Sequence, residues 1–237
     1  MLTYEEVAKL ELYKWKLRMR KNPNIIEKAS KGVQRKINNL FPDKYHEIIT
    51  NTIKNYLKAV LYGTKYVTKP PIKNLSLKER EKLVAEKIKL YKNTAVIEGA
   101  ATGAGGFVAG LADFPLLLGI KIKFLYDLAS IYGYDVDDYT ERLYILHIFQ
   151  LAFSSQSHVN EIFYRMENWD AYVKTLPADI NELDWRAFQE EYRDYLDIAK
   201  MIQMLPGVGA VAGIYVNNKL LKKLGETAIN SYRMRFL

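Results

Sequence analysis

The sequence predicts an all-α protein that folds as a single domain. Apolar residues recur at helical spacing along the chain, and no run shows the sustained alternation of a half-buried strand. There is no repeat of 20–50 residues and no low-complexity tail. At 237 residues the chain is long enough for two small domains, but the best linker, Lys69–Lys73, separates segments that both need apolar partners. We therefore predict one domain over residues 1–237, with residues 1–65 as a docked N-terminal arm.

The clearest helix covers residues 45–61. Its apolar side chains follow i, i+3, i+4 spacing over successive turns and stop before Gly63, a favourable C-terminal cap. They are Tyr45, Ile48, Ile49, Ile53, Tyr56, Leu57, Val60 and Leu61. Residues 1–21 also have the composition of an amphipathic helix, and their early acids exclude a secretory signal there.

Capping residues and prolines delimit the other helices. Ser76 with Glu79 forms a capping box just after the Pro70-Pro71 break, and Asp138 is the N-cap of a second helix. A proline followed by glycine separates the last two segments. The first helix predicted in this way begins at residue 77 and runs past residue 92. The others cover residues 139–154, 185–203 and 208–224.

The most unusual segment is Glu98–Ile120, a nearly uncharged run rich in glycine and alanine. Glycine costs about 1 kcal/mol against alanine inside an exposed helix, so this run needs another helix, or lipid, against its backbone. Asp113-Phe114-Pro115 has the form of an N-cap followed by an early helical proline, which predicts a helical hairpin rather than one rod. Glycines four residues apart let helix backbones approach closely, and three pairs occur: Gly99/Gly103, Gly106/Gly110 and Gly209/Gly213.

Two placements of these glycine segments are open. They pack on each other in a core, which we favour, or they lie on a membrane surface, because the uncharged stretch is too short to span a bilayer. Basic residues frame both segments, as expected of a hairpin on an anionic leaflet. The lysines predicted to contact the membrane are Lys121, Lys123, Lys219, Lys222 and Lys223.

Charge is distributed in blocks. Residues 1–97 hold 22 Lys/Arg against 9 Asp/Glu, whereas residues 98–199 hold 7 against 17. Either the basic block meets an anionic surface, or the basic ends pack against the acidic middle. Nucleic acid is disfavoured as the partner, because Tyr13, Trp15 and Tyr45 follow an apolar helix face rather than a stacking platform.

A small group of residues has side chains suited to catalysis or metal binding. The absence of cysteine excludes disulfides and thiolate sites. Glu98, Asp113, Glu141 and His147 are the candidates for acid/base or metal-dependent hydrolysis, because a polar stripe follows the helix that carries His147. With no HExxH and no Glu-x-x-His repeat, we expect no metal and no cofactor. In the other interpretation, Glu98 and Asp113 pair with Arg142 in a buried structural ion pair.

The glycine run and the residues after it resemble a known family. The pattern Glu98-Gly99, Gly103–Gly106, Ala112–Pro115, Tyr132-Gly133-Tyr134 and Glu141-Arg142 is similar to that of the EcsC protein family. That family is named for a bacterial gene found beside an ABC transporter. The resemblance therefore implies a bacterial protein that serves an ABC-type transport or secretion system, with the transporter complex as a candidate partner.

Charge and resemblance together predict the function. We expect a non-enzymatic, cytoplasmic protein that associates peripherally with an anionic membrane surface, through the glycine hairpin and its lysines. The alternative is a hydrolase that uses Glu98, Asp113, Glu141 and His147. The sequence gives no indication of the oligomeric state.

Overall fold

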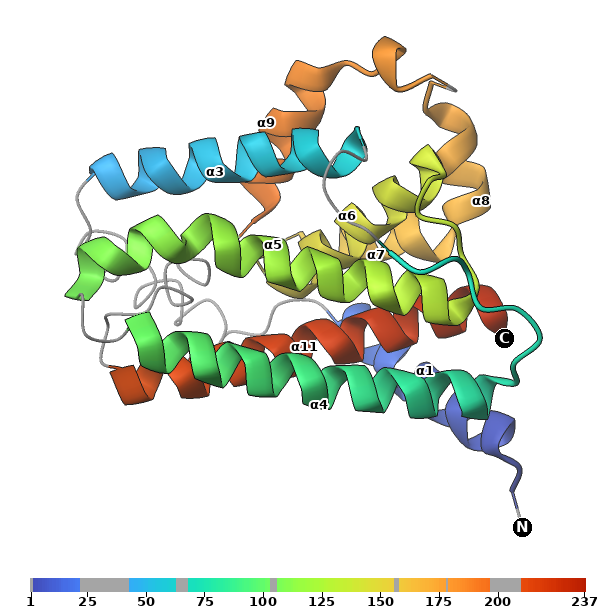
Figure 1. Cartoon of the computed structure of the whole chain (residues 1–237). Coiled ribbons are helices and arrows are strands. Elements are labelled where there is room, and N and C mark those ends of the chain that lie inside the picture. The colour runs from blue at the N-terminus through green and yellow to red at the C-terminus, as the bar shows by residue number, and fades with distance from the viewer. Residues whose placement is uncertain are drawn as a thin grey trace.

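Long helices lie side by side through the centre of the molecule (Figure 1). The computed structural model describes residues 2–21, 43–62, 68–102, 106–155, 158–177, 179–196 and 210–237. Apart from one isolated bridge between Ser154 and Leu196, the described residues form only helices, turns and connecting segments. The prediction of an all-α fold is confirmed.

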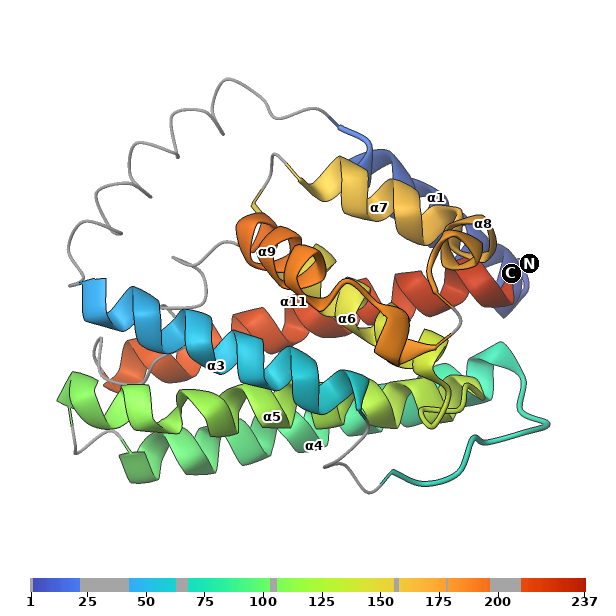
Figure 2. The same ribbon diagram turned by 90° about the horizontal axis from the view of Figure 1, so that it is seen from above.

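Five long helices form the bundle: α3 (Asp43–Leu61), α4 (Leu77–Thr102), α5 (Gly106–Tyr132), α6 (Tyr139–Phe153) and α11 (Ala210–Phe236). Helix α4 runs antiparallel to both α5 and α11 (Figures 1 and 2). As a result, the C-terminal end of α4 and the N-terminal ends of α5 and α11 lie at the same end of the bundle.

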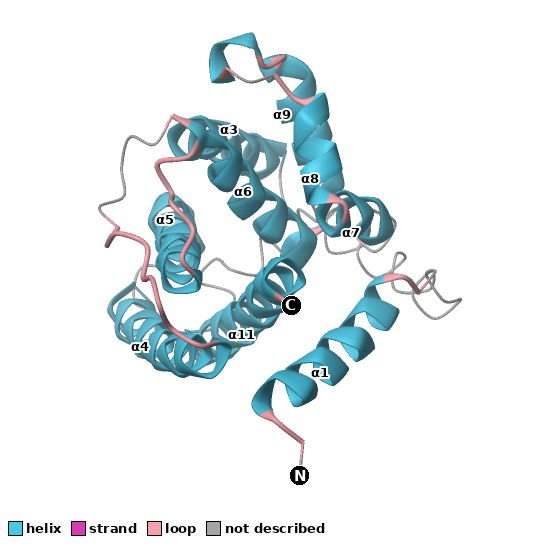
Figure 3. Ribbon diagram, turned by 90° about the vertical axis from the view of Figure 1, so that its right-hand side faces the viewer, coloured by secondary structure: helices cyan, strands magenta, loops and turns pink. Residues whose placement is uncertain are grey.

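Shorter helices lie around the bundle. They are α1 (Tyr4–Met19), α7 (Val159–Glu167), α8 (Trp169–Tyr172) and α9 (Trp185–Tyr195), with 3-10 turns at Val173–Thr175 and Ile180–Glu182. Helix α7 packs on α6, and α9 packs on α3. Helix α1 contacts α4, α7 and α11 and lies on the opposite side of the molecule from α3 (Figure 3). Of the two helices in the predicted N-terminal arm, α3 is thus itself part of the bundle, and α1 lies against its outside.

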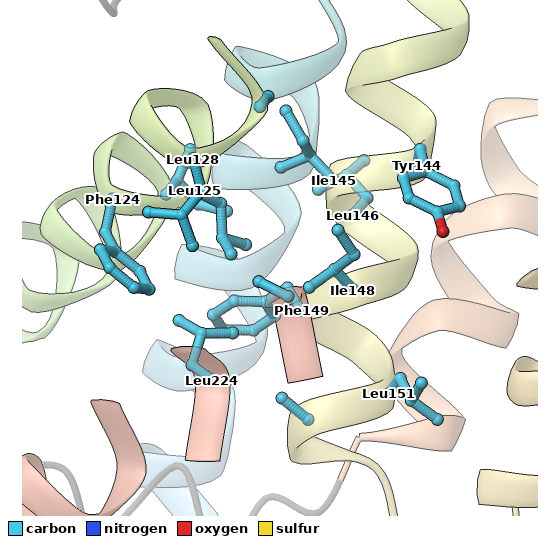
Figure 4. Packing of buried hydrophobic residues seen from close by; sticks show 14 of the residues in the cluster. Phe124, Leu125, Leu128, Tyr144, Ile145, Leu146, Ile148, Phe149, Leu151 and Leu224 are labelled. Atoms are coloured by element: carbon cyan, nitrogen blue, oxygen red, sulfur yellow. The ribbon is translucent and has the colours of Figure 1, made fainter. Parts of the chain in front are cut away.

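Helix α6 forms the centre of the core. Every side chain from Leu143 to Phe153 is buried, as expected for a helix that is apolar on all sides. Figure 4 shows Phe149 of α6 near Leu224 of α11, and Ile145 facing Leu125 and Leu128 of α5. One continuous hydrophobic cluster therefore joins the central helices.

The capping residues act as predicted. The backbone N–H and the hydroxyl of Ser76 both donate to the Glu79 carboxylate, at 2.8 and 2.6 Å, and α4 begins at the next residue after Ser76. Asp138 accepts a hydrogen bond from the Thr140 N–H at 2.8 Å at the start of α6. These local interactions fix two helix starts before any tertiary contact is considered.

The predicted helix start at Asp113 is wrong. Helix α5 begins at Gly106 and continues through Pro115 without interruption. A proline inside a helix costs about 3 kcal/mol, because it lacks the N–H and crowds the preceding turn. Phe114, Leu117 and Leu118 are buried around it, and this packing holds the helix together across the proline. Helix α4 ends at Thr102 and α5 begins at Gly106, and the residues between them lie outside the described part of the chain.

The last two predicted helices have different bounds from those expected. Helix α9 ends at Tyr195, where Leu196 forms the bridge to Ser154, rather than continuing to residue 203. Helix α11 continues to Phe236, well past the predicted end at residue 224. At Gly225 the absence of a side chain permits a close approach to α4, because a Cβ there would lie 3.0 Å from Cδ1 of Ile88. The two helices therefore cross closely at this glycine.

Candidate functional site

The predicted glycine segments lie at one end of the bundle. Gly99 is near the C-terminal end of α4, Gly106 and Gly110 are in the first turns of α5, and Gly213 is near the start of α11. These helix ends lie together in Figures 1 and 2, which is the arrangement that packing between the two segments requires. Gly103 and Gly209 lie outside the described residues. Close packing between the glycine pairs therefore stays a prediction.

Arg142 lies near the other end of the bundle. Its guanidinium donates to the backbone carbonyls of Leu61 at 2.8 Å, Val136 at 3.0 Å and Asp137 at 2.6 Å. Asp113 is about 28 Å from Tyr132 along α5, at 1.5 Å per residue. The side chains of Glu98 and Asp113 lie outside the described residues. The described contacts of Arg142 thus give no support to the predicted ion pair; they tie the end of α3 to the α5–α6 connection.

Glu141 and His147 are both buried, in separate contacts. Glu141 accepts hydrogen bonds from the Tyr232 hydroxyl at 2.7 Å and the Arg235 guanidinium at 2.6 Å. Nδ1 of His147 donates to the Leu143 carbonyl at 2.8 Å, and its ring lies edge-on to Trp169 and Tyr172. Desolvation raises the pKa of Glu141 and lowers the pKa of His147 to about 4. The structure does not bring these two side chains into one site.

Of the residues that carry the resemblance between positions 132 and 142, Tyr132, Tyr134 and Glu141 join one cluster around Tyr232 and Arg235. Tyr132 and Tyr134 both stack on Tyr232, with ring centroids 4.9 and 5.4 Å apart. The Arg235 guanidinium lies 3.8 Å from the centroid of Tyr134. Gly133, between the two tyrosines, has a φ of +94°, which a residue with a side chain rarely adopts. This cluster fixes the C-terminal part of α11 against α5 and α6.

The predicted membrane-contact lysines fall into two groups. Lys121 is buried, with an exposed fraction of 4%, and Lys123 forms an ion pair with Asp127, which Lys87 also contacts. We therefore no longer treat these two lysines as candidate membrane contacts. Lys219, Lys222 and Lys223 are exposed on α11, and their i, i+3, i+4 spacing places them on one side of that helix.

A groove of 740 Å³ lies between α1, α4 and α11, next to these α11 lysines. Its lining includes the apolar Ile88 and Ile229, together with five cationic side chains and two carboxylates. Two of the cations are paired: Arg18 with Glu226 at 2.7 Å and Arg233 with Glu11 at 2.8 Å. The other lining residues are Lys14, Lys92, Lys222 and Asn230.

The three lysines of the groove have no ion-pair partner among the residues that the structure describes. Lys14 comes from α1, Lys92 from α4 and Lys222 from α11, so the bundle alone does not form this surface. Uncompensated cations on three converging helices create a positive potential that attracts anions. The groove is therefore the best candidate functional site in the described part of the chain.

Helix α1 is held beside the groove by a partly buried network of ion pairs and hydrogen bonds. The Arg233 guanidinium donates to both Glu81 oxygens at 2.6 Å, and to Glu11 of α1 at 2.8 Å. The Tyr4 hydroxyl of α1 also donates to Glu81, at 2.6 Å. Burial, together with the hydrogen bond to Glu81, raises the pKa of Tyr4 to about 12, so this donor keeps its proton at neutral pH.

Sequence reasoning missed both this network and the groove. Glu81 and Arg233 lie far apart in the chain, and neither belongs to a motif. One signal was present: Glu81 lies three residues before Val84, on the apolar face of its helix. A charge on a buried face requires a partner, and these two residues supply it to each other.

The groove lacks the features of a metal site, since the described residues contain no group of three or more acidic or histidine side chains placed to bind a metal ion. None of the helices, over the residues described, has the length and apolar character needed to cross a bilayer.

The family model and one curated relative each match nearly the whole chain. A model of the EcsC protein family matches residues 6–237. The chain is 42% identical over 237 residues to "Protein EcsC" of Bacillus subtilis (strain 168), covering 100% of this chain and 98% of that protein. It is 32% identical over 145 residues to "Uncharacterized protein YdbA" of the same organism, covering 60% of this chain and 53% of that protein. No solved structure matches the chain. The chain belongs to the EcsC protein family.

Proposed function

We propose that the protein is a non-enzymatic, peripheral membrane protein that binds anionic headgroups through the groove between α1, α4 and α11. The observation that carries this proposal is the meeting of Lys14, Lys92 and Lys222 in one groove without ion-pair partners among the described residues. The exposed Lys219 and Lys223 extend the basic surface along α11. Each basic residue near an anionic leaflet contributes about 1 kcal/mol, so a surface of this size supports reversible binding.

The test is co-sedimentation with anionic and neutral vesicles. A variant with Lys14, Lys92, Lys219 and Lys222 replaced by Gln should lose about 4 kcal/mol of binding free energy, which is roughly a thousandfold in affinity. The matched control replaces four exposed lysines elsewhere: Lys54, Lys58, Lys73 and Lys174. Both variants change the net charge equally, so only the position of the charges differs between them.

The expected outcome has three parts. The groove variant loses anionic-vesicle binding, the control retains it, and both melt close to the wild type, because exposed charges contribute little to stability. Binding by the wild type should weaken in 1 M salt, where the screening length falls to about 3 Å. Absence of wild-type binding, or an equal loss in the two variants, would refute the proposal.

We further propose, from the family relationship alone, that the membrane it meets carries an ABC-type transport or secretion system. Site-specific photo-crosslinking in native cells, from a probe at Lys219 and from a control probe at Lys54, tests this step. A transporter subunit should be captured from position 219 and not from position 54. Capture of no membrane protein from position 219 would leave lipid binding standing and remove the transporter.

A further inference from the structure

Helix α1 carries a second apolar face that nothing described in the structure covers. Among the residues that the structure describes, twelve large hydrophobic side chains are exposed, and six of them lie between Leu2 and Leu17. Four of them share one side of the helix: Val7, Leu10, Tyr13 and Leu17, with exposed fractions of 40%, 47%, 58% and 43%. We call these four residues the outer stripe. Their spacing of three and four residues aligns them along successive turns.

The opposite side of α1 is the one that packs on the bundle. Ala8, Leu12 and Trp15 are buried, and the Trp15 ring lies edge-on to Phe163 at 5.6 Å. At 100° per residue, Leu10 and Leu17 point roughly opposite to these three side chains. Helix α1 therefore has two apolar faces, only one of which the bundle uses.

Basic residues border the outer stripe. Lys9 lies beyond one edge of the stripe and Lys14 lies near the other edge, next to Val7. Both are exposed, and Lys21 follows the end of the helix. Lys14 also lines the groove between α1, α4 and α11, so the stripe and the groove form adjoining parts of one surface. Glu6 lies within the angular range of the stripe, in the first turn of the helix, where its carboxylate accepts a hydrogen bond from the Thr3 N–H at 2.7 Å in the capping box. An apolar stripe with lysines at its edges is the pattern of a helix that lies in the plane of a membrane interface.

We infer that α1 inserts the outer stripe into the interfacial region of an anionic bilayer, with Lys9, Lys14 and Lys21 at the level of the headgroups. Charge complementarity selects this occupant: a lipid surface offers acyl chains to Leu10 and Leu17 and phosphates to the flanking lysines. Tyr13 suits this depth because its ring is apolar and its hydroxyl is polar. The inference rests on the proposed membrane association and adds a hydrophobic contact that headgroup binding alone does not require.

The first experiment compares Leu→Gln variants, since Gln has a helix propensity close to that of Leu. Leu10→Gln with Leu17→Gln should weaken binding to anionic vesicles by about tenfold per leucine, because roughly half of each side chain remains to be buried. Leu90→Gln on α4 is the matched control, since Leu90 is 55% exposed and lines a different groove. The melting temperatures of all variants should stay near that of the wild type.

The second experiment measures depth. The chain has no cysteine, so Tyr13→Cys or Leu90→Cys gives a single site for an environment-sensitive fluorophore. Vesicle binding should shift the emission of the label at position 13 to the blue, and lipids brominated on the acyl chain should quench it. The label at position 90 should show neither effect.

Each outcome separates this inference from the proposed function. If the Leu→Gln variants bind as well as the wild type and the label at position 13 is not quenched, insertion is overturned and headgroup binding stands. If the wild type binds neutral and anionic vesicles equally and the stripe variants lose that binding, insertion is supported and the electrostatic proposal is overturned. A dimer in lipid-free solution that Leu10→Gln with Leu17→Gln converts to a monomer would show that the stripe contacts a second copy of the chain, and would overturn the inference. Failure of the wild type to bind any vesicle would overturn both.

Discussion

Breaking the ion pair between Glu81 and Arg233 should destabilise the protein more than any change to its surface charges. The exposed fractions of these side chains are 6% and 8%, and two hydrogen bonds of 2.6 Å join them. Removing one partner of a buried pair leaves the other without compensation and costs about 3–5 kcal/mol. Arg233→Met fits the site in volume and removes the charge.

The expected magnitude is at the lower end of that range. After Arg233→Met, Glu81 keeps the Tyr4 hydroxyl at 2.6 Å and the Tyr132 hydroxyl at 3.3 Å as donors. We therefore expect a loss of about 3 kcal/mol in the free energy of unfolding. For a chain of this length, each kcal/mol lowers the melting temperature by about 2–4 °C, which gives a drop of roughly 6–12 °C.

The assay is urea unfolding of the wild type, Arg233→Met, Glu81→Gln and the double variant. The double variant should lose much less than the sum of the two single losses, because the second change removes a charge that is already unpaired. Hydrogen exchange in α1 should also rise, since Arg233 bonds Glu11 and Glu81 bonds Tyr4 on that helix. Single variants that melt within 2 °C of the wild type, or additive losses in the cycle, would refute the reasoning.

The remaining predictions concern a helix crossing, a buried histidine and a cap. Gly225→Leu should lower the free energy of unfolding by about 1–3 kcal/mol, because even a Cβ at this position would lie 3.0 Å from Ile88. Adding Ile88→Ala should restore part of that loss. A Gly225→Leu variant that melts like the wild type would contradict the close crossing. Burial lowers the pKa of His147 to about 4, so its imidazole is neutral in the folded protein. Its contribution to the free energy of unfolding is therefore complete above the unfolded pKa of about 6.5 and falls as the pH drops towards 4. About 2 kcal/mol should be lost by pH 5, and His147→Gln should flatten the unfolding profile between pH 7 and 5; an unchanged profile would show that the imidazole is not the group responsible. Asp138→Ala should cost about 1 kcal/mol through loss of the bond to the Thr140 N–H, measured in the same urea assay, and Asp137→Ala serves as the exposed control.

The sequence by itself determined the class of the fold and most of the helix starts. The apolar residues of 45–61 predict α3, and the capping signals at Ser76 and Asp138 predict where α4 and α6 begin. These features are local, since a cap or a helical face depends on residues within one or two turns. The helix ends were less predictable: Pro115 lies inside α5 because the side chains around it are buried, and no local rule includes that burial.

Only the tertiary structure decided the candidate site. Lys121 and Lys222 stand in similar sequence surroundings, beside glycine-rich segments, yet Lys121 is buried and Lys222 lines the groove. The groove needs Lys14, Lys92 and Lys222 from three helices, and the outward direction of Leu10 depends on which face of α1 the bundle covers. The sequence shows that α1 has apolar residues on both sides, but not which side is buried. That choice belongs to the long-range contacts of Trp15, Glu11 and Tyr4, which form only when α1, α4, α7 and α11 come together.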